Sequence, residues 1–140
     1  MALERNSKGT SVAAATLLWP WTTSLAAGVI GGAGFALMNL SINIFAVGLG
    51  SLAAGAFWFA LVGGAVAAAR KSGDRRALRQ VGRNPWGFAM VPALIGGGGV
   101  ALFNLLMLNI AGAIFGGLGA AAMIFVVVGV VAAVAGGGKR

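Results

Sequence analysis

The ionisable side chains of this chain are mostly basic, and they stand outside its apolar stretches. Ten Lys and Arg residues against two Asp and Glu residues, with no His, give a net charge of +8. Ammonium and guanidinium groups bind phosphate, so this set could recognise nucleic acid or anionic lipid. The candidate phosphate-binding residues lie in one linker and at the C-terminal end: Arg70, Lys71, Arg75, Arg76, Arg79, Arg83, Lys139 and Arg140.

The linker, residues 70–84, admits two interpretations. Arg75, Arg79 and Arg83 follow one another at i, i+4 and i+8, which makes one basic stripe if the segment is helical. Such a stripe binds backbone phosphate without reading sequence. The plainer interpretation is the positive-inside rule, under which Lys and Arg only set the orientation of membrane helices. That rule predicts that both termini and the linker are cytoplasmic.

Catalytic chemistry has little support in the sequence. The chain has no Cys and no His, so it lacks thiol nucleophiles, imidazole bases and the usual ligands of zinc, copper and haem. Its acids are Glu4 and Asp74, both outside the apolar stretches, whereas proton relays need ionisable groups within the membrane. We therefore expect a protein that is not an enzyme and that holds no metal or cofactor.

The stretches on either side of the linker are uncharged and long. The chain is 59% hydrophobic and 9% charged, with a mean hydropathy of +0.96, which is too little charge to cover a soluble domain. No Asp, Glu, Lys or Arg occurs between Gly9 and Ala69, or between Asn84 and Gly138. Each stretch has room for two membrane helices of about 20 residues. We expect one all-α domain, residues 1–140, with four hydrophobic helices.

The two uncharged stretches are copies of each other. The matching blocks are residues 20–21 and 85–86, 30–34 and 95–99, 36–40 and 101–105, 43–44 and 109–110, and 50–54 and 116–120. We expect repeat 1 at about 11–69 and repeat 2 at about 85–136. Each repeat would cross a membrane twice, so both copies would point the same way, unlike the inverted repeats of many transporters.

Each repeat is predicted to be a helical hairpin with a short lead-in helix. The long helices would cover about 20–40, 44–69, 85–106 and 110–135, and the lead-in helices 11–18 and 74–82. The N-terminal apolar run continues directly into the first long helix, so we do not expect a cleaved signal peptide. The turns would be capped by Asn residues, which bond local backbone and tolerate left-handed geometry: Asn39, Asn43, Asn104 and Asn109. Alternatively, these Asn side chains form a polar constriction in a pore.

Small residues recur at helical spacing along the apolar segments. The chain has 25 Gly residues, and in lipid such residues let helix backbones approach closely. A glycine costs about 1 kcal/mol relative to Ala within a helix, so we expect something to pack over them, either within one bundle or between subunits. The candidate helix-packing residues are Gly28, Gly32, Gly50, Gly55, Gly112 and Gly116.

Aromatic residues stand where the apolar helices meet the basic side. Trp19, Trp21 and Trp86 lie there, and Trp is enriched where membranes meet water. We interpret them as an interfacial belt.

The pattern as a whole resembles the small, highly hydrophobic major capsid proteins of archaeal spindle-shaped viruses. It consists of apolar hairpins from Pro20 to Ala69 and from Pro85 to Ala135, with basic tails and a basic linker. The resemblance implies insertion into a host membrane, followed by assembly of many copies into helical strands around DNA in the virion. It also implies that the candidate phosphate-binding residues face DNA and that the glycine faces make subunit contacts.

A cellular membrane protein is the alternative. Such a four-helix protein would act as a holin-like pore or channel, or as an accessory subunit of a membrane complex. Capsid and pore alike would have lipid as a partner, and the capsid would also have copies of itself.

Overall fold

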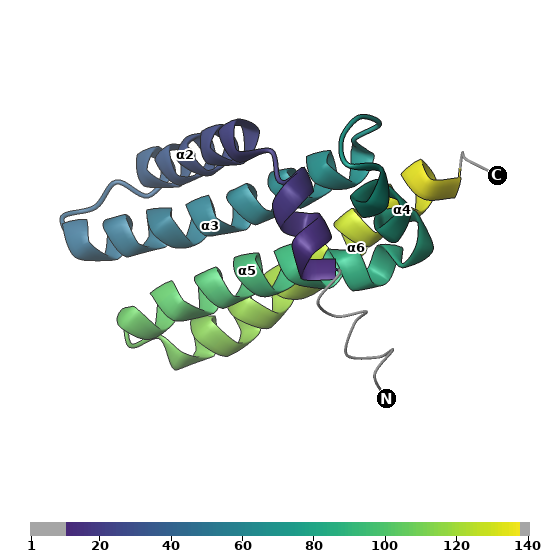
Figure 1. Cartoon of the computed structure of the whole chain (residues 1–140). Coiled ribbons are helices and arrows are strands. Elements are labelled where there is room, and N and C mark those ends of the chain that lie inside the picture. Colours follow the sequence, from purple (N-terminus) through teal and green to yellow (C-terminus); the bar gives the residue numbers. More distant parts are fainter. Residues whose placement is uncertain (1–10, 138–140) are drawn as a thin grey trace.

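The computed structural model describes residues 11–137 and is all-α (Figure 1). Its long helices are α2 (Trp21–Met38), α3 (Ile44–Ala69), α5 (Pro85–Leu106) and α6 (Gly117–Gly137), the last preceded by a π-helical turn, η1 (Gly112–Gly116). A short helix at 11–18 and α4 (Arg75–Arg83) precede the two hairpins. The predicted all-α fold and its lead-in helices are thereby confirmed.

Four helices are long and apolar enough to cross a membrane. The spans are Trp21–Met38, Ile44–Ala69, Pro85–Leu106 and Gly112–Gly137. Helices are suited to lipid because they satisfy their own backbone hydrogen bonds. Large apolar side chains cover their outer surfaces; Phe115, for example, is 76% exposed. These properties indicate a membrane-associated protein.

The long helices form two hairpins, α2 with α3 and α5 with α6, that point the same way (Figure 1). Both interhelical turns lie at one end of the molecule, which we call the turn end. The segment 70–83, with its cations, lies at the opposite end, which we call the basic end. The predicted parallel orientation of the two hairpins is therefore confirmed.

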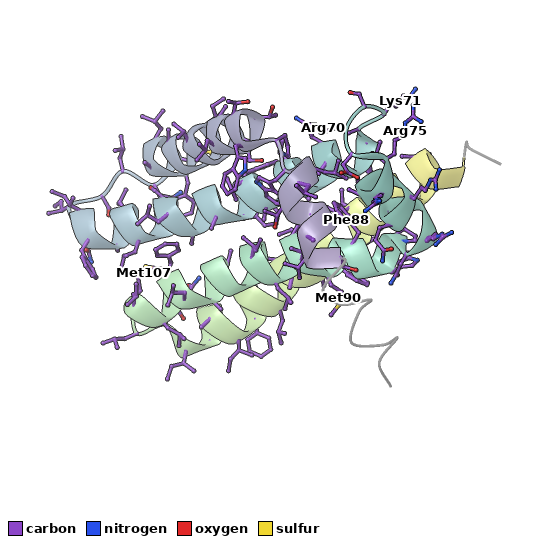
Figure 2. All side chains as sticks on the ribbon, in the orientation of Figure 1. Arg70, Lys71, Arg75, Phe88, Met90 and Met107 are labelled. Atoms are coloured by element: carbon purple, nitrogen blue, oxygen red, sulfur yellow. The ribbon has the colours of Figure 1, made fainter. Side chains whose placement is uncertain are left out.

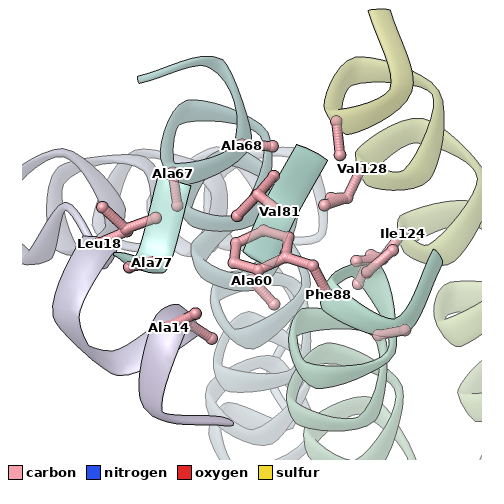
Figure 3. Packing of buried hydrophobic residues seen from close by; sticks show 14 residues of the cluster. Ala14, Leu18, Ala60, Ala67, Ala68, Ala77, Val81, Phe88, Ile124 and Val128 are labelled. Atoms are coloured by element: carbon pink, nitrogen blue, oxygen red, sulfur yellow. The ribbon is translucent and has the colours of Figure 1, made fainter. Parts of the chain in front are cut away.

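The buried core lies toward the basic end, where the short helices join the hairpins (Figure 3). In the helix at 11–18, Ala14, Ala15 and Leu18 are buried, at a spacing that places them on one face. Leu18 lies beside Ala67 of α3 and Ala77 of α4 (Figure 3). The short helices therefore cover the ends of the long ones and hold the two hairpins together.

The short helix α4 buries one face because its sequence is amphipathic. Asp74 caps α4, its Oδ1 accepting hydrogen bonds from the N–H of Arg76 at 2.7 Å and of Ala77 at 3.2 Å. Ala77 and Val81 are buried, whereas the arginines of this helix are exposed. The arginines are thus held on the outer side of α4 by the burial of its apolar side.

Candidate functional site

The helices α2 and α3 cross at backbone contact. A Cβ atom added to Gly32 would lie 2.8 Å from the carbonyl oxygen of Ser51. One added to Gly28 would lie 3.1 Å from the carbonyl oxygen of Gly55, and one added to Gly55 would lie 3.0 Å from that of Gly28. Gly50, also on α3, faces the ring of Phe35 instead. Close approach thus requires glycine at position 32, and Gly28 and Gly55 lie in contacts where a Cβ atom would be tightly held.

The second hairpin repeats this crossing. A Cβ atom added to Gly97 would lie 2.8 Å from the carbonyl oxygen of Gly117, and these residues align with Gly32 and Ser51 of the first repeat. The sequence spacing predicted Gly112 and Gly116 as the helix-packing residues of this hairpin, but in the structure they lie outside the crossing.

Gly112 belongs to the turn, not to the crossing. Its Cβ position is occupied by the side chains of Asn104 and Asn109. Gly116 makes an ordinary contact at 3.6 Å with Val100. Both residues are part of the π-helical turn η1, which precedes the crossing, so the closest approach falls at Gly117.

A third contact of small residues joins the two hairpins, and the sequence reasoning missed it. A Cβ atom added to Gly64 of α3 would lie 2.8 Å from Cβ of Pro92, and one added to Gly96 of α5 would lie 2.8 Å from Cβ of Ala60. Gly99 would similarly meet Ala56 at 2.7 Å. The sequence does contain a pattern that indicates this contact, because Ala56, Ala60 and Gly64 are small residues that recur every four positions.

Other glycines face open space. Among the described residues, no atom outside the local backbone lies within 4 Å of a Cβ atom added to Gly34, Gly48, Gly98 or Gly119. These four lie in the halves of their helices nearer the turn end, whereas Gly137, which also has no such atom within 4 Å, is the last residue of α6 at the basic end. An apolar cleft of about 420 Å³ also separates the hairpins there, bordered by residues that include Phe57, Val100 and Gly119. The two hairpins are thus incompletely packed against each other toward the turn end.

The turn asparagines bond local backbone, and the two repeats do so alike. The side chain of Asn39 donates to the carbonyl of Phe35 at 2.9 Å, and Asn104 donates to that of Val100 at 2.8 Å. Asn43 accepts from the N–H of Ala46 at 3.0 Å, and Asn109 accepts from that of Gly112 at 2.9 Å. In the second turn Asn109 also donates to Asn104 at 3.2 Å. Asn43 and Asn109 therefore cap helix N-termini, whereas Asn39 and Asn104 donate to carbonyls in the last turns of α2 and α5.

The basic end presents its described cations to the outside. Arg70 forms the C-cap of α3, and Lys71 follows it in the loop (Figure 2). The exposed cations in this part of the chain are Arg70, Lys71, Arg75, Arg76, Arg79 and Arg83. Lys139 and Arg140 lie outside the described residues.

The tryptophans at the basic side have two different environments. Trp21 and Trp86 are 59% and 45% exposed, in keeping with an interfacial position. Trp19 is buried against Phe59 and over Gly63, so it is a packing residue and not part of the expected belt. Trp86 similarly covers Gly129 and stands 5.2 Å from Phe125 between ring centroids.

Neither a metal-binding cluster among the described residues nor a similar known protein indicates a function. Within residues 11–137, no three His, Cys, Asp or Glu residues gather where they could hold a metal ion. No family model, curated protein or solved structure matches the chain. Its function must therefore be argued from its own surfaces.

Proposed function

We propose that the protein is a structural membrane protein that assembles with copies of itself into a coat. It would insert in a host membrane, assemble as the capsid of a virion and turn its basic end toward nucleic acid. Its role would be packing, without a catalytic reaction.

The observation that carries this proposal is the incomplete packing of the turn end. Gly34, Gly48, Gly98 and Gly119 face open space within a single chain. Each of these glycines costs about 1 kcal/mol relative to Ala in a helix. A helix face that meets only lipid tails does not require residues this small. A second copy lying close to these positions would turn them into helix contacts of the kind seen at Gly32 and Gly97.

The position of the charges supports the nucleic-acid side of the proposal. All described cations lie at the basic end, so copies assembled in one orientation would form one continuous basic surface. Such a surface neutralises backbone phosphate with little regard to sequence.

A pore is the less well supported alternative. Its polar constriction would use the turn asparagines, but their side chains hydrogen bond to local helix ends. The uncharged spans leave few other polar groups to line a channel.

Removal of detergent from the purified full chain tests the proposal. We expect tubes or shells in electron micrographs, and co-purified nucleic acid that resists nuclease. A small discrete oligomer without nucleic acid would contradict the coat, and dye leakage from protein-loaded liposomes would favour the pore.

Two substitutions in α6 locate the contact between copies. Gly119→Leu adds a side chain at the open turn-end position, and we expect assembly to be lost while helicity in detergent is kept. Ala133→Leu is the matched control, since it enlarges an exposed small residue of the same helix nearer the basic end. Equal assembly by both variants would place the contact elsewhere.

A further inference from the structure

A broad hollow opens at the basic end between the end of α3, α4 and the last turn of α6. Its volume is about 1120 Å³. The backbones of α4 and α6 meet beside it, where a Cβ atom added to Gly136 would lie 3.0 Å from Cα of Gly82. This contact makes the hollow a feature of the folded chain and not of a single loop.

Cations are among the residues that line the hollow. They are Arg70, Lys71, Arg75 and Arg79. Asp74, the one acid among residues 11–137, is absent from the lining, and its Oδ1 accepts the two backbone hydrogen bonds that cap α4. Four positive charges and no acid among the described lining residues favour an anionic ligand. Arginine binds phosphate, as it does carboxylate, through paired N–H donors.

Apolar side chains line the hollow as well. Leu78 is half-buried and Val81 is buried, whereas Val134 of α6 is 73% exposed. The hollow therefore offers cations and hydrocarbon surface side by side. Nucleic acid phosphates have no apolar part to place against Val134, whereas a phospholipid has an acyl chain directly below its phosphate.

The position of the hollow also fits a lipid. It lies where the spans Ile44–Ala69 and Gly112–Gly137 end, which is the depth of lipid headgroups if these helices cross the bilayer. The amphipathic helix α4 has the composition of a helix that lies in that interfacial layer.

We propose that this hollow binds an anionic phospholipid, with the headgroup phosphate among the four cations and an acyl chain along Val134. Arg76 and Arg83 do not line the hollow and remain available to nucleic acid in an assembled coat. The inference shares with the proposed function only the membrane-inserted form of the chain and does not require self-assembly.

Two double variants with the same loss of charge test the site. Arg75→Gln with Arg79→Gln removes cations that line the hollow, and Arg76→Gln with Arg83→Gln removes two from the same helix outside it. The full-length proteins are reconstituted with equal amounts of phosphatidylcholine and phosphatidylglycerol, extracted in mild detergent, and analysed by native mass spectrometry. All four arginines are exposed, and circular dichroism checks that both variants fold.

We expect the first variant to retain less phosphatidylglycerol, by about fivefold for each charge or about 30-fold for the pair, and the second to match the wild type. If both variants lose phosphatidylglycerol equally, the proposed site is wrong, and the lipid is held by general attraction to positive charge. Displacement of bound lipid by millimolar inorganic phosphate would indicate a site for free phosphate. Displacement by a short DNA duplex, lost in the first variant only, would assign the hollow to nucleic acid.

The lipid measurement is made on the smallest unit extracted in detergent. It is therefore independent of assembly, which is followed separately by electron microscopy. A chain that binds the lipid but forms no coat would overturn the proposed function alone.

Discussion

At the scale of single residues, identical residue types have opposite roles. Gly32 lies against the carbonyl of Ser51, whereas Gly34, two residues later, faces open space. Asparagines at both turns cap helices in the same way, but only the second turn contains a strained residue. Leu108 has φ 56, the one positive value among the described non-glycine residues.

Replacing Leu108 by Asn should stabilise the protein. The left-handed conformation costs an L-residue about 1–2 kcal/mol because its Cβ atom crowds the following carbonyl oxygen, and Asn tolerates it better. The side chain of Leu108 is 88% exposed, so little packing is lost. We expect the free energy of unfolding in detergent to rise by about 1 kcal/mol.

Leu106→Asn provides the control, because Leu106 lies within α5 and is also exposed. It should leave the protein no more stable than the wild type. A gain at Leu106 equal to that at Leu108 would rule out backbone strain as the cause.

At the scale of helices, packing depends on backbone approach more than on interlocking side chains. At the α2·α3 and α5·α6 crossings, a Cβ atom added to Gly32 or to Gly97 would lie 2.8 Å from a carbonyl oxygen of the facing helix. Such crossings gain van der Waals contact in lipid, where the hydrophobic effect between helices is absent. A single methyl group at these points must separate the helices.

A pair of substitutions in α2 separates packing from helix propensity. Gly32→Ala should destabilise the hairpin by about 1–3 kcal/mol, since its Cβ would overlap the Ser51 carbonyl. Gly34→Ala should stabilise the isolated chain by up to about 1 kcal/mol, because its Cβ enters open space. Thermal unfolding of both variants in detergent measures the difference, and equal effects would contradict the crossing at Gly32.

At the scale of the whole molecule, the buried side chains are concentrated toward the basic end. The buried cluster there includes Leu18, Phe88, Ile124 and Val128, whereas the turn end carries an apolar cleft and open glycines. We expect the hairpins to be held together at one end and to vary in separation at the other.

Distances between spin labels test this difference. The chain has no native Cys, so paired labels can be placed directly. Labels at Ile42 and Ile110 report on the turn end, and labels at Ala69 and Ala135 on the basic end, all four being exposed positions. In detergent the turn-end pair should give the broader distance distribution, and assembly should narrow it. A turn-end distribution as narrow as that of the basic end would contradict uneven packing.

The sequence by itself determined the all-α class, the tandem parallel hairpins, the Asn caps and the gathering of cations at one end. Each depends on local information: the length of an apolar run, a capping side chain, or the position of charges along the chain. In α4 the apolar positions Ala77 and Val81 stand among arginines, so this amphipathic segment marks its own buried face. The helix at 11–18 is apolar on both faces, since it exposes Val12 and Leu17 while it buries Leu18.

Only the tertiary structure decided which glycines are contacts and which cations act together. The long helices are apolar on every side, so their sequence does not mark the face that meets a neighbour. The rotation of α2 about its axis therefore places Gly32 in the helix contact and Gly34 outside it. In the second hairpin, the turn η1 takes up Gly112, so the helix contact falls at Gly117. The packing of α4 against the end of α6 likewise places Arg75 and Arg79 in the hollow and leaves Arg76 and Arg83 outside. Both outcomes arise from contacts between residues distant in the chain, which local spacing does not specify.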